Sequence, residues 1–267
     1  MSFAEQAPES DRPGRARDLR PELTVGHVVR DDRKRSMKTS ERVAVDIVRD
    51  IVAQGLHTGS RLPLEAAMAK QYGVSRASLR EALRLLEVQG LIRLKPGPGG
   101  GPVVGTVEPG NLARTASLYF HLGGATYRQL MQTQVLLEPV TARLAAQSRD
   151  RRIVMAPYVD SGEIGDEKHY RALTLDFHDA VWQLAANPVL SLLTQAITHL
   201  VADHVVSTMD PVEMRHDILD EHAALARAIA AGHADKAAAL MGEHFQAQLD
   251  YYERNWPARL AELIEWR

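Results

Sequence analysis

Three arginines in the N-terminal third of the chain have the spacing of a single helix face. Arg76, Arg80 and Arg84 recur every four residues, and Ser75 and Ser78 stand near the first of them. Residues four apart on a helix are neighbours, so these guanidinium groups should point the same way. Guanidinium groups bind guanine edges and phosphates, and a helix N-terminus favours a phosphate. The pattern predicts a helix that reads a DNA groove, although a solvated surface helix is the simpler alternative.

Three histidines in the C-terminal half could bind a metal ion. His178, His222 and His244 each lie beside an apolar stripe of a different predicted helix. A histidine so placed is most often a hydrogen-bonded core residue. Three imidazoles on neighbouring helices can instead hold a divalent ion of the zinc or nickel class and leave positions open for an anion. Both interpretations stay open on these residues alone.

Two His-Asp pairs, His178-Asp179 and His216-Asp217, are of the kind that helical metal-dependent phosphohydrolases use. Adjacent residues on a helix diverge by about 100°, so one member of each pair should face solvent. The sequence contains no nucleophile elbow, dinucleotide fingerprint or zincin helix. We therefore expect no enzyme, with such a phosphohydrolase and an architectural DNA-binding protein without a ligand as the alternatives.

Length and composition favour two folded units without disulfides. The chain has 267 residues, of which 45% are hydrophobic and 25% charged. Cysteine is absent, which excludes thiolate metal sites and thiol nucleophiles. No apolar run approaches the roughly 18 residues of a membrane span, and the first residues lack the apolar core of a signal peptide. These features predict a cytoplasmic protein with no membrane partner.

The net charge of −2 hides an uneven distribution. Residues 61–95 contain seven Lys or Arg against three acids, whereas residues 96–267 contain 14 bases and 21 acids. A basic module attached to an acidic one indicates that only the first meets a polyanion.

Apolar spacing and helix breakers predict the elements that carry the arginines. A helix should begin at Thr39 or Ser40, capped by a hydroxyl, and end at Gly55; a second should cover 64–72. A third should be capped by Ser75 and run to about Gln89, burying Leu79, Leu83 and Leu86. Residues 91–95 and 102–105 flank a glycine-rich turn and predict a hairpin. This order is that of a winged helix-turn-helix, with the turn as a wing tip rather than a nucleotide loop.

The rest of the chain is predicted to be helical almost throughout. Expected helices cover 111–122, 126–147, 166–186, 188–209, 212–231, 234–255 and 257–266. Their short connections predict an antiparallel bundle. The fold class is therefore mainly α: an N-terminal winged helix-turn-helix followed by an all-helical antiparallel bundle. The expected division is a flexible basic tail (1–37), a DNA-binding domain (38–107), a linker (108–115) and an effector-binding and dimerisation domain (116–267).

The N-terminal half resembles the DNA-binding domain of the GntR family. The resemblance spans about 40–105 and rests on PLEAAMAKQYGVSRASLREALRLLEVQGLIRLKPGPGGGPVV, residues 63–104. Ala66 stands where several relatives have another DNA-contacting arginine, which leaves the bases that are read undefined. The expected DNA-binding residues are Arg61, Glu65, Ser75, Arg76, Ser78, Arg80, Arg84, Lys95, Gly97 and Gly99.

The helical half resembles the FadR-like subgroup of that family, which carries an FCD-type effector domain. The similar pieces are LLEPVTARLAA (136–146), DFHDAVWQLAANPVL (176–190), DEHAALARAIAAGH (220–233) and EHF (243–245). The resemblance places His178, His222 and His244 at metal-ligand positions. Thr174 stands where metal-binding members have an aspartate, whereas Asp176 should face elsewhere, and Gln134 stands where relatives often have an effector-binding arginine. The expected effector-binding residues are Gln134, Arg143, Thr174, His178, His222 and His244.

Together these patterns predict a ligand-responsive transcriptional regulator, most simply a repressor. We expect a homodimer that binds double-stranded operator DNA and a small organic acid or acyl effector, with a divalent metal, zinc or nickel, as a possible cofactor. Within the family, a metal-free pocket for a larger apolar effector such as a fatty acyl thioester is the main alternative.

Overall fold

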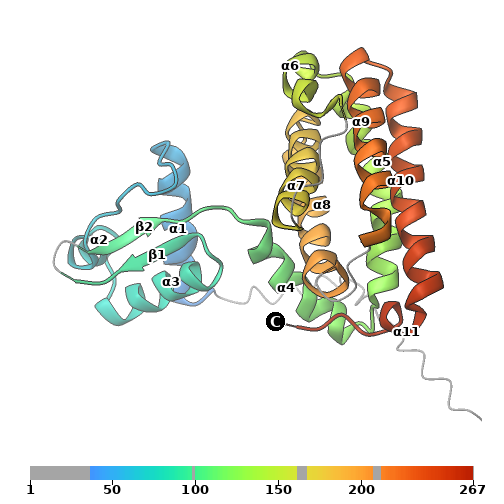
Figure 1. Cartoon of the computed structure of the whole chain (residues 1–267). Coiled ribbons are helices and arrows are strands. Elements are labelled where there is room, and N and C mark those ends of the chain that lie inside the picture. Colours follow the sequence, from blue (N-terminus) through green and yellow to red (C-terminus); the bar gives the residue numbers. More distant parts are fainter. Residues whose placement is uncertain (1–36, 98–99, 161–166, 207–211, 267) are drawn as a thin grey trace, which may run out of the picture. The chain divides into compact units, whose positions relative to one another are not determined.

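The computed structural model describes residues 37–97, 100–160, 167–206 and 212–266 (Figure 1). All of the expected flexible tail except Met37 lies outside these residues, and so does Gly99.

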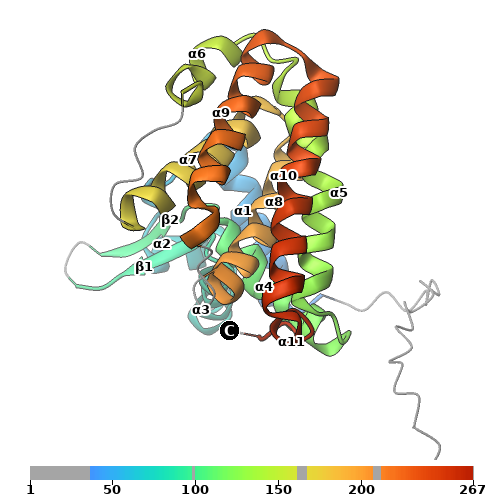
Figure 2. The same cartoon turned by 45° about the vertical axis from the view of Figure 1, so that its right-hand side comes forward.

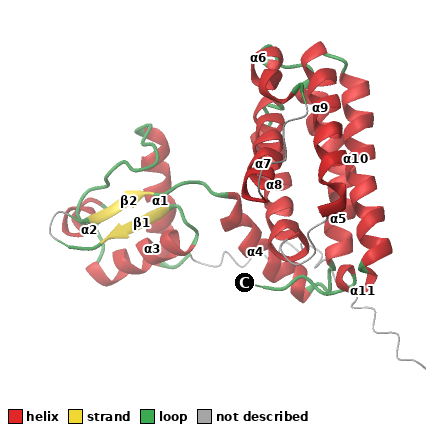
Figure 3. Cartoon of the chain, in the orientation of Figure 1, coloured by secondary structure: helices red, strands yellow, loops and turns green. Residues whose placement is uncertain are grey.

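The N-terminal part of the described chain is a winged helix-turn-helix (Figure 3). Its helices are α1 (Thr39–Ala53), α2 (Glu65–Gln71) and α3 (Arg76–Val88). Strands β1 (Ile92–Lys95) and β2 (Gly101–Val104) pair in antiparallel fashion, with Ile92 opposite Val104. The predicted stripe of Leu79, Leu83 and Leu86 is buried and packs against Ile47 of α1 and Ile92 of β1. The predicted element order is confirmed.

The helix starts agree with the predicted caps at α3 but not at α1. The hydroxyl of Ser75 accepts a hydrogen bond from the backbone N–H of Ser78 at 3.1 Å, which caps α3 as expected. The start of α1 has no hydroxyl cap. The backbone N–H of Lys38 instead donates to the Glu41 carboxylate at 3.1 Å, and Ser40 is buried inside the first turn.

A short extended segment before α2 was not predicted. The backbone of residues 59–62 pairs with β2: Gly59 N–H donates to Val104 at 2.9 Å, and Leu62 N–H donates to Pro102 at 3.0 Å. An isolated bridge joins Arg61 to Val103. This pairing places Arg61 beside the wing strands. Its expected contact with DNA stays a prediction.

The remaining helices form a bundle (Figures 1 and 2). They are α4 (Pro109–Leu122), α5 (Tyr127–Ala145), α6 (Arg151–Met155), α7 (Glu167–Leu184), α8 (Pro188–Val201), α9 (Arg215–Ala231), α10 (Ala234–Asn255) and α11 (Pro257–Leu260). A π-helical turn, Ala202–Val206, continues α8. Helix α5 packs along α10 and also contacts α7 and α8, α9 packs on α10, and α4 packs on α8. No described helix is long and apolar enough to cross a membrane.

The described part of the bundle core contains apolar side chains, several polar ones and a buried acid. Phe177, Val181, Ile229 and Met241 are among its fully buried apolar residues. Glu138 of α5 is also fully buried. Its Oε2 accepts hydrogen bonds from the indole N–H of Trp182 on α7 at 2.9 Å and from the hydroxyl of Thr141 at 3.1 Å. This carboxyl joins α5 to α7 inside the bundle.

Three features of the helical half differ from the prediction. Helix α4 begins at Pro109, within the segment assigned to a linker, and α6 was not expected. The last helix ends at Leu260 instead of 266, because the backbone that follows it pairs with residues 125–127. The N–H of Tyr127 donates to the carbonyl of Glu262 at 3.2 Å, and the N–H of Ile264 donates to the carbonyl of Ala125 at 3.0 Å. The division between the two expected domains stays a prediction.

Candidate functional site: a recognition helix and a histidine-lined cavity

The three arginines of α3 lie together on its exposed side. Arg76, Arg80 and Arg84 are exposed, whereas Leu79 and Leu83 on the neighbouring face are buried. The other described members of the expected DNA-binding set are exposed or half-buried; they are Arg61, Glu65, Ser75, Ser78, Lys95 and Gly97. The helix therefore packs through its leucines and presents guanidinium groups to solvent, as a recognition helix requires.

An ion pair between α2 and α3 holds the middle arginine. Nε of Arg80 lies 2.8 Å from Oε2 of Glu65, and both groups are partly exposed. An exposed pair of this kind adds little to stability. The pair places the guanidinium of Arg80 on the side of α3 that faces α2. The expected contact of Glu65 with DNA stays a prediction.

The three predicted metal-binding histidines converge in the helical half. His178 of α7, His222 of α9 and His244 of α10 are buried, and one possible ligand atom of each lies within 4.8 Å of the others. The Nε2 atoms of His222 and His244 are 3.3 Å apart. Two nitrogens bound to one tetrahedral zinc at ordinary Zn–N lengths are about 3.4 Å apart. His222 and His244 therefore already have the spacing of two zinc ligands.

Glu221 and Gln248 orient His244. Nδ1 of His244 lies 2.6 Å from Oε2 of Glu221, so the carboxylate accepts a proton that sits on Nδ1. The opposite nitrogen, Nε2, then carries a lone pair and accepts from the Gln248 amide at 2.7 Å. A carboxylate that holds the far nitrogen of a histidine is a common support for metal ligands.

Burial keeps two of the histidines neutral. Desolvation, with a smaller contribution from His244, lowers the pKa of His178 to about 3 and the pKa of His222 well below its ordinary value. Neutral imidazole is the form that binds a metal. Nδ1 of His178, Nδ1 of His222 and Oγ1 of Thr174 are buried, and no hydrogen-bond partner is found for them among the described residues. Such unpaired atoms are costly, and they fit a site that takes a ligand or ion.

A cavity of about 130 Å³ lies beside this cluster, and we call it the inner cavity. His178, Thr174 and Gln134 all line it, so three of the expected effector-binding residues meet there. The amide of Gln134 is buried and donates to the hydroxyl of Thr198 at 3.0 Å. The rest of the wall is mainly apolar, with Val201, Ile218 and Phe245 among its members.

Arg143 does not belong to this site. Its side chain is exposed and forms an ion pair with Asp235 on α10, and it does not line the inner cavity. Arg143 lies nine residues after Gln134 on α5. This separation is two and a half helical turns, so the two side chains lie far apart along the helix and on opposite sides of it. We do not retain it as an effector-binding residue.

Of the two His-Asp pairs, only His178-Asp179 has one buried and one exposed member. His178 is buried while Asp179 is exposed, and both His216 and Asp217 are exposed. Among the described residues, the only cluster of at least three possible metal ligands is the one formed by His178, His222 and His244. The geometry gives the phosphohydrolase alternative no second ligand set.

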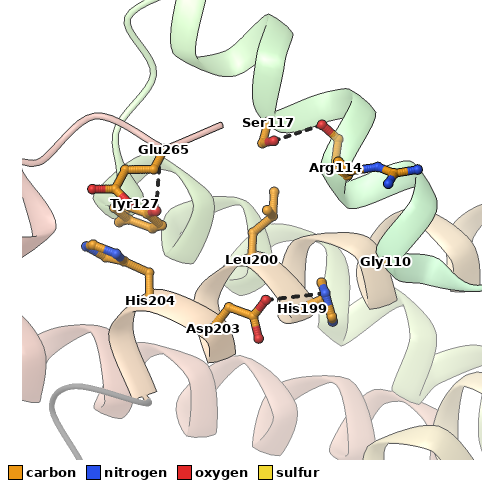
Figure 4. Close-up of a pocket in the computed structure, with 9 residues that line it drawn as sticks. All are labelled: Gly110, Arg114, Ser117, Tyr127, His199, Leu200, Asp203, His204 and Glu265. Atoms are coloured by element: carbon orange, nitrogen blue, oxygen red, sulfur yellow. Dashed lines mark hydrogen bonds and ion pairs between the residues drawn. The ribbon is translucent and has the colours of Figure 1, made fainter. Parts of the chain in front are cut away.

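A second, smaller cavity of about 60 Å³ lies between α4, α8 and residue 265 (Figure 4). His199 pairs with Asp203 at 3.4 Å on one side of it. On the other side His204 stacks on Tyr127, with ring centroids 3.9 Å apart. His199 is exposed, whereas His204 is buried and contacts Glu262 at 2.9 Å. His204 therefore helps to hold the C-terminal segment.

Several residues around the histidine cluster were not predicted. Gln248 lies four residues after His244, and Arg171 lies seven residues before His178, so helical spacing could have indicated both. Glu221 meets His244 from a different helix, and no spacing in the sequence signals that contact.

Comparison with known proteins agrees with this architecture. Residues 39–100 match the description "Bacterial regulatory proteins, gntR family", and residues 129–247 match the FCD domain. The chain is 26% identical to the HTH-type transcriptional regulator LutR of Bacillus subtilis over 75% of this chain and 96% of that protein. It is 27% identical to the Uxu operon regulator of Haemophilus influenzae, over 78% of this chain and 80% of that protein.

Two further proteins extend the comparison. The chain is 25% identical to the HTH-type transcriptional repressor NanR of Salmonella arizonae, over 66% of this chain and 68% of that protein. Among solved structures, Streptococcus agalactiae GntR is similar in fold, with a TM-score of 0.60 and 22% identity over 79% of this chain and 99% of that chain. The winged helix-turn-helix, the histidine-lined helical half and these matches together place the chain in the GntR family of bacterial regulatory proteins, as a transcriptional regulator with an FCD domain.

Proposed function

We propose that this regulator is a ligand-responsive repressor that acts in the cytoplasm by binding operator DNA as a homodimer. The exposed row of Arg76, Arg80 and Arg84 on α3 carries the DNA-binding part of the proposal. Two recognition helices in successive major grooves would read half-sites about 10 bp apart in a near-palindrome. A relative named as a repressor supports the sign of regulation.

DNA binding is tested by fluorescence anisotropy with the DNA upstream of the protein's own gene, compared with a scrambled fragment across a salt series. Specific binding that weakens steeply with salt, through loss of phosphate contacts, supports the proposal. Equal binding to both fragments with and without added zinc argues against an operator at that position. Sedimentation of the protein without DNA tests the homodimer.

The effector is proposed to occupy the inner cavity and to be a small organic acid or acyl compound. The volume of about 130 Å³ carries this part of the proposal. Pockets that bury drug-sized ligands are several times larger, so a long acyl thioester would require the cavity to open. Effector binding would change the affinity for DNA through a coupling free energy between the two sites.

A divalent metal at the histidine cluster is the proposed cofactor. His178, His222 and His244 would hold it, with Glu221 fixing the orientation of His244. When bound, the metal would offer open coordination positions to an oxygen donor of the effector. Thr174 would contribute a neutral hydroxyl near the site instead of a charged ligand.

Removing one ligand should empty this metal site. We expect the wild-type protein to retain about one zinc or nickel ion per chain after exposure and desalting, and we expect His222→Ala to lose it because two imidazoles bind such ions far less tightly than three. Elemental analysis measures the ratio. His216→Ala, an exposed histidine on the same helix, is the matched control and should keep the metal. A wild-type protein that retains neither metal removes the cofactor from the proposal.

A further inference from the structure

The inner cavity is adjacent to a second, larger chamber between α7 and α8. This outer chamber has a volume of about 540 Å³, and the start of α4 forms one of its walls. Arg171, Leu175, Thr198 and Ala202 line both spaces. These four residues therefore form the partition between the inner cavity and the outer chamber.

Charge is distributed unequally across this partition. Among the described residues that line the inner cavity, Arg171 is the only lysine, arginine, aspartate or glutamate. The outer chamber contains three carboxylates, those of Glu108, Asp179 and Asp203. Arg171 at the partition is therefore the group that would attract an anion, while the inner wall beyond it suits an apolar group.

We propose that Arg171 binds the acid group of the effector at this partition, with the apolar remainder of the effector in the inner cavity. Arg171 lies on the face of α7 that also carries Leu175 and His178, four and seven residues later. It is half-buried, which strengthens a charge-assisted hydrogen bond relative to one in water. Arg171 already interacts within the chain, and its five N–H donors allow a carboxylate to bind in addition.

This arrangement makes Arg171 a specificity-determining residue. A neutral ligand of the same shape would lose the pairing with the guanidinium, and a cationic one would be repelled by it. The inference rests on the proposed role of the inner cavity as the effector site, but it does not require a metal at the histidine cluster.

The test measures binding of unbranched monocarboxylates, from propanoate to octanoate, and of their primary amides to the full-length, chelator-treated protein by titration calorimetry. We expect at least one acid to bind wild-type protein roughly tenfold or more tightly than its amide. Arg171→Gln should remove that preference while leaving amide binding unchanged. Arg171→Lys should retain part of it, since the charge remains but the bidentate geometry is lost.

Arg143→Gln is the matched control, because Arg143 is an arginine of the same helical half that does not line the cavity. It should bind like the wild type. An unchanged acid preference in Arg171→Gln overturns the assignment of Arg171 and leaves the effector cavity standing. Failure of the wild type to bind any acid or amide, both after chelation and after zinc is restored, overturns both the assignment and the proposed role of the cavity. Melting curves establish that each variant is folded.

Discussion

Replacing Arg76 by alanine should weaken binding to the operator by about ten- to a hundredfold. Arg76 is the first residue of α3, exposed and adjacent to the Ser75 cap, and the N-terminal residues of a recognition helix meet base edges. A bidentate arginine–guanine contact is worth about 1–3 kcal/mol of discrimination. The loss should be greatest on the native operator and small on scrambled DNA. Anisotropy titrations with both fragments measure it.

Two companion variants sharpen this test. Arg49→Ala removes an exposed arginine of α1 that pairs with Asp46 on its own helix, and it should leave operator affinity unchanged. Arg80→Ala should also weaken binding, since Glu65 holds that guanidinium against the same helix face. Unchanged affinity in both Arg76→Ala and Arg80→Ala would mean that α3 does not read the operator.

The second large effect concerns the buried acid Glu138. Burial raises the pKa of its carboxyl to about 7, against smaller opposing contributions from the hydrogen bonds of Trp182 and Thr141. Oε1 is buried and has no hydrogen-bond partner among the described residues. In the unfolded chain, Glu138 has an ordinary glutamate pKa near 4.3 and loses its proton at low pH. In the folded protein, the same carboxyl keeps its proton until the pH approaches 7.

The sign of the pH dependence follows from this difference. Between about pH 4.5 and pH 7 the folded state binds more protons than the unfolded state, so stability falls as the pH rises through this window. The contribution of Glu138 to this loss between pH 5 and pH 8 is about 2 to 3 kcal/mol. Glu138→Gln removes the titrating group. The unfolding free energy of this variant should therefore fall by about 2 to 3 kcal/mol less than that of the wild type between pH 5 and pH 8.

Urea unfolding at pH 5, 6, 7 and 8 measures this effect. All three tryptophans, Trp182, Trp256 and Trp266, lie in the helical half, so tryptophan fluorescence follows that half alone. The readout is the pH slope, because the glutamine amide nitrogen is itself buried and changes the absolute stability. Glu243→Gln, an exposed position on α10, is the matched control and should keep the wild-type slope. A wild-type slope in Glu138→Gln would mean that this carboxyl is ionised in the folded protein.

The sequence contained enough information for the elements that depend on local patterns. The leucine stripe of α3, the Ser75 cap and the hairpin all depend on residues within a few positions of one another, and they were predicted correctly. The inward placement of His178, His222 and His244 followed from helical periodicity in the same way. Their convergence on one point depends on how α7, α9 and α10 pack, which the resemblance to a family supplied and spacing alone did not.

Several features that local patterns could not indicate depend on contact between distant segments. Residues 59–62 appear as a turn in the sequence, yet they pair with β2 because its free edge lies beside them. His204 is buried because Tyr127 and Glu262 come to it from elsewhere in the chain. Glu138 has the appearance of a surface residue until Trp182 and the bundle enclose it. No window of a few residues contains these partners.

The pairing of the C-terminal segment with residues 121–127 has a consequence for the order of folding. The hydrogen bonds that join His121 to Ile264 and Tyr127 to Glu265 close loops of 143 and 138 residues. Helical bundles usually fold quickly because their contacts are local, whereas these contacts join residues separated by about half the length of the chain. During synthesis the apolar surface around Tyr127 and Leu130 stays uncovered until Leu260 and Ile264 arrive. Completion of this half is therefore a late event, and a chain interrupted before Leu260 presents that surface to chaperones and proteases instead of burying it.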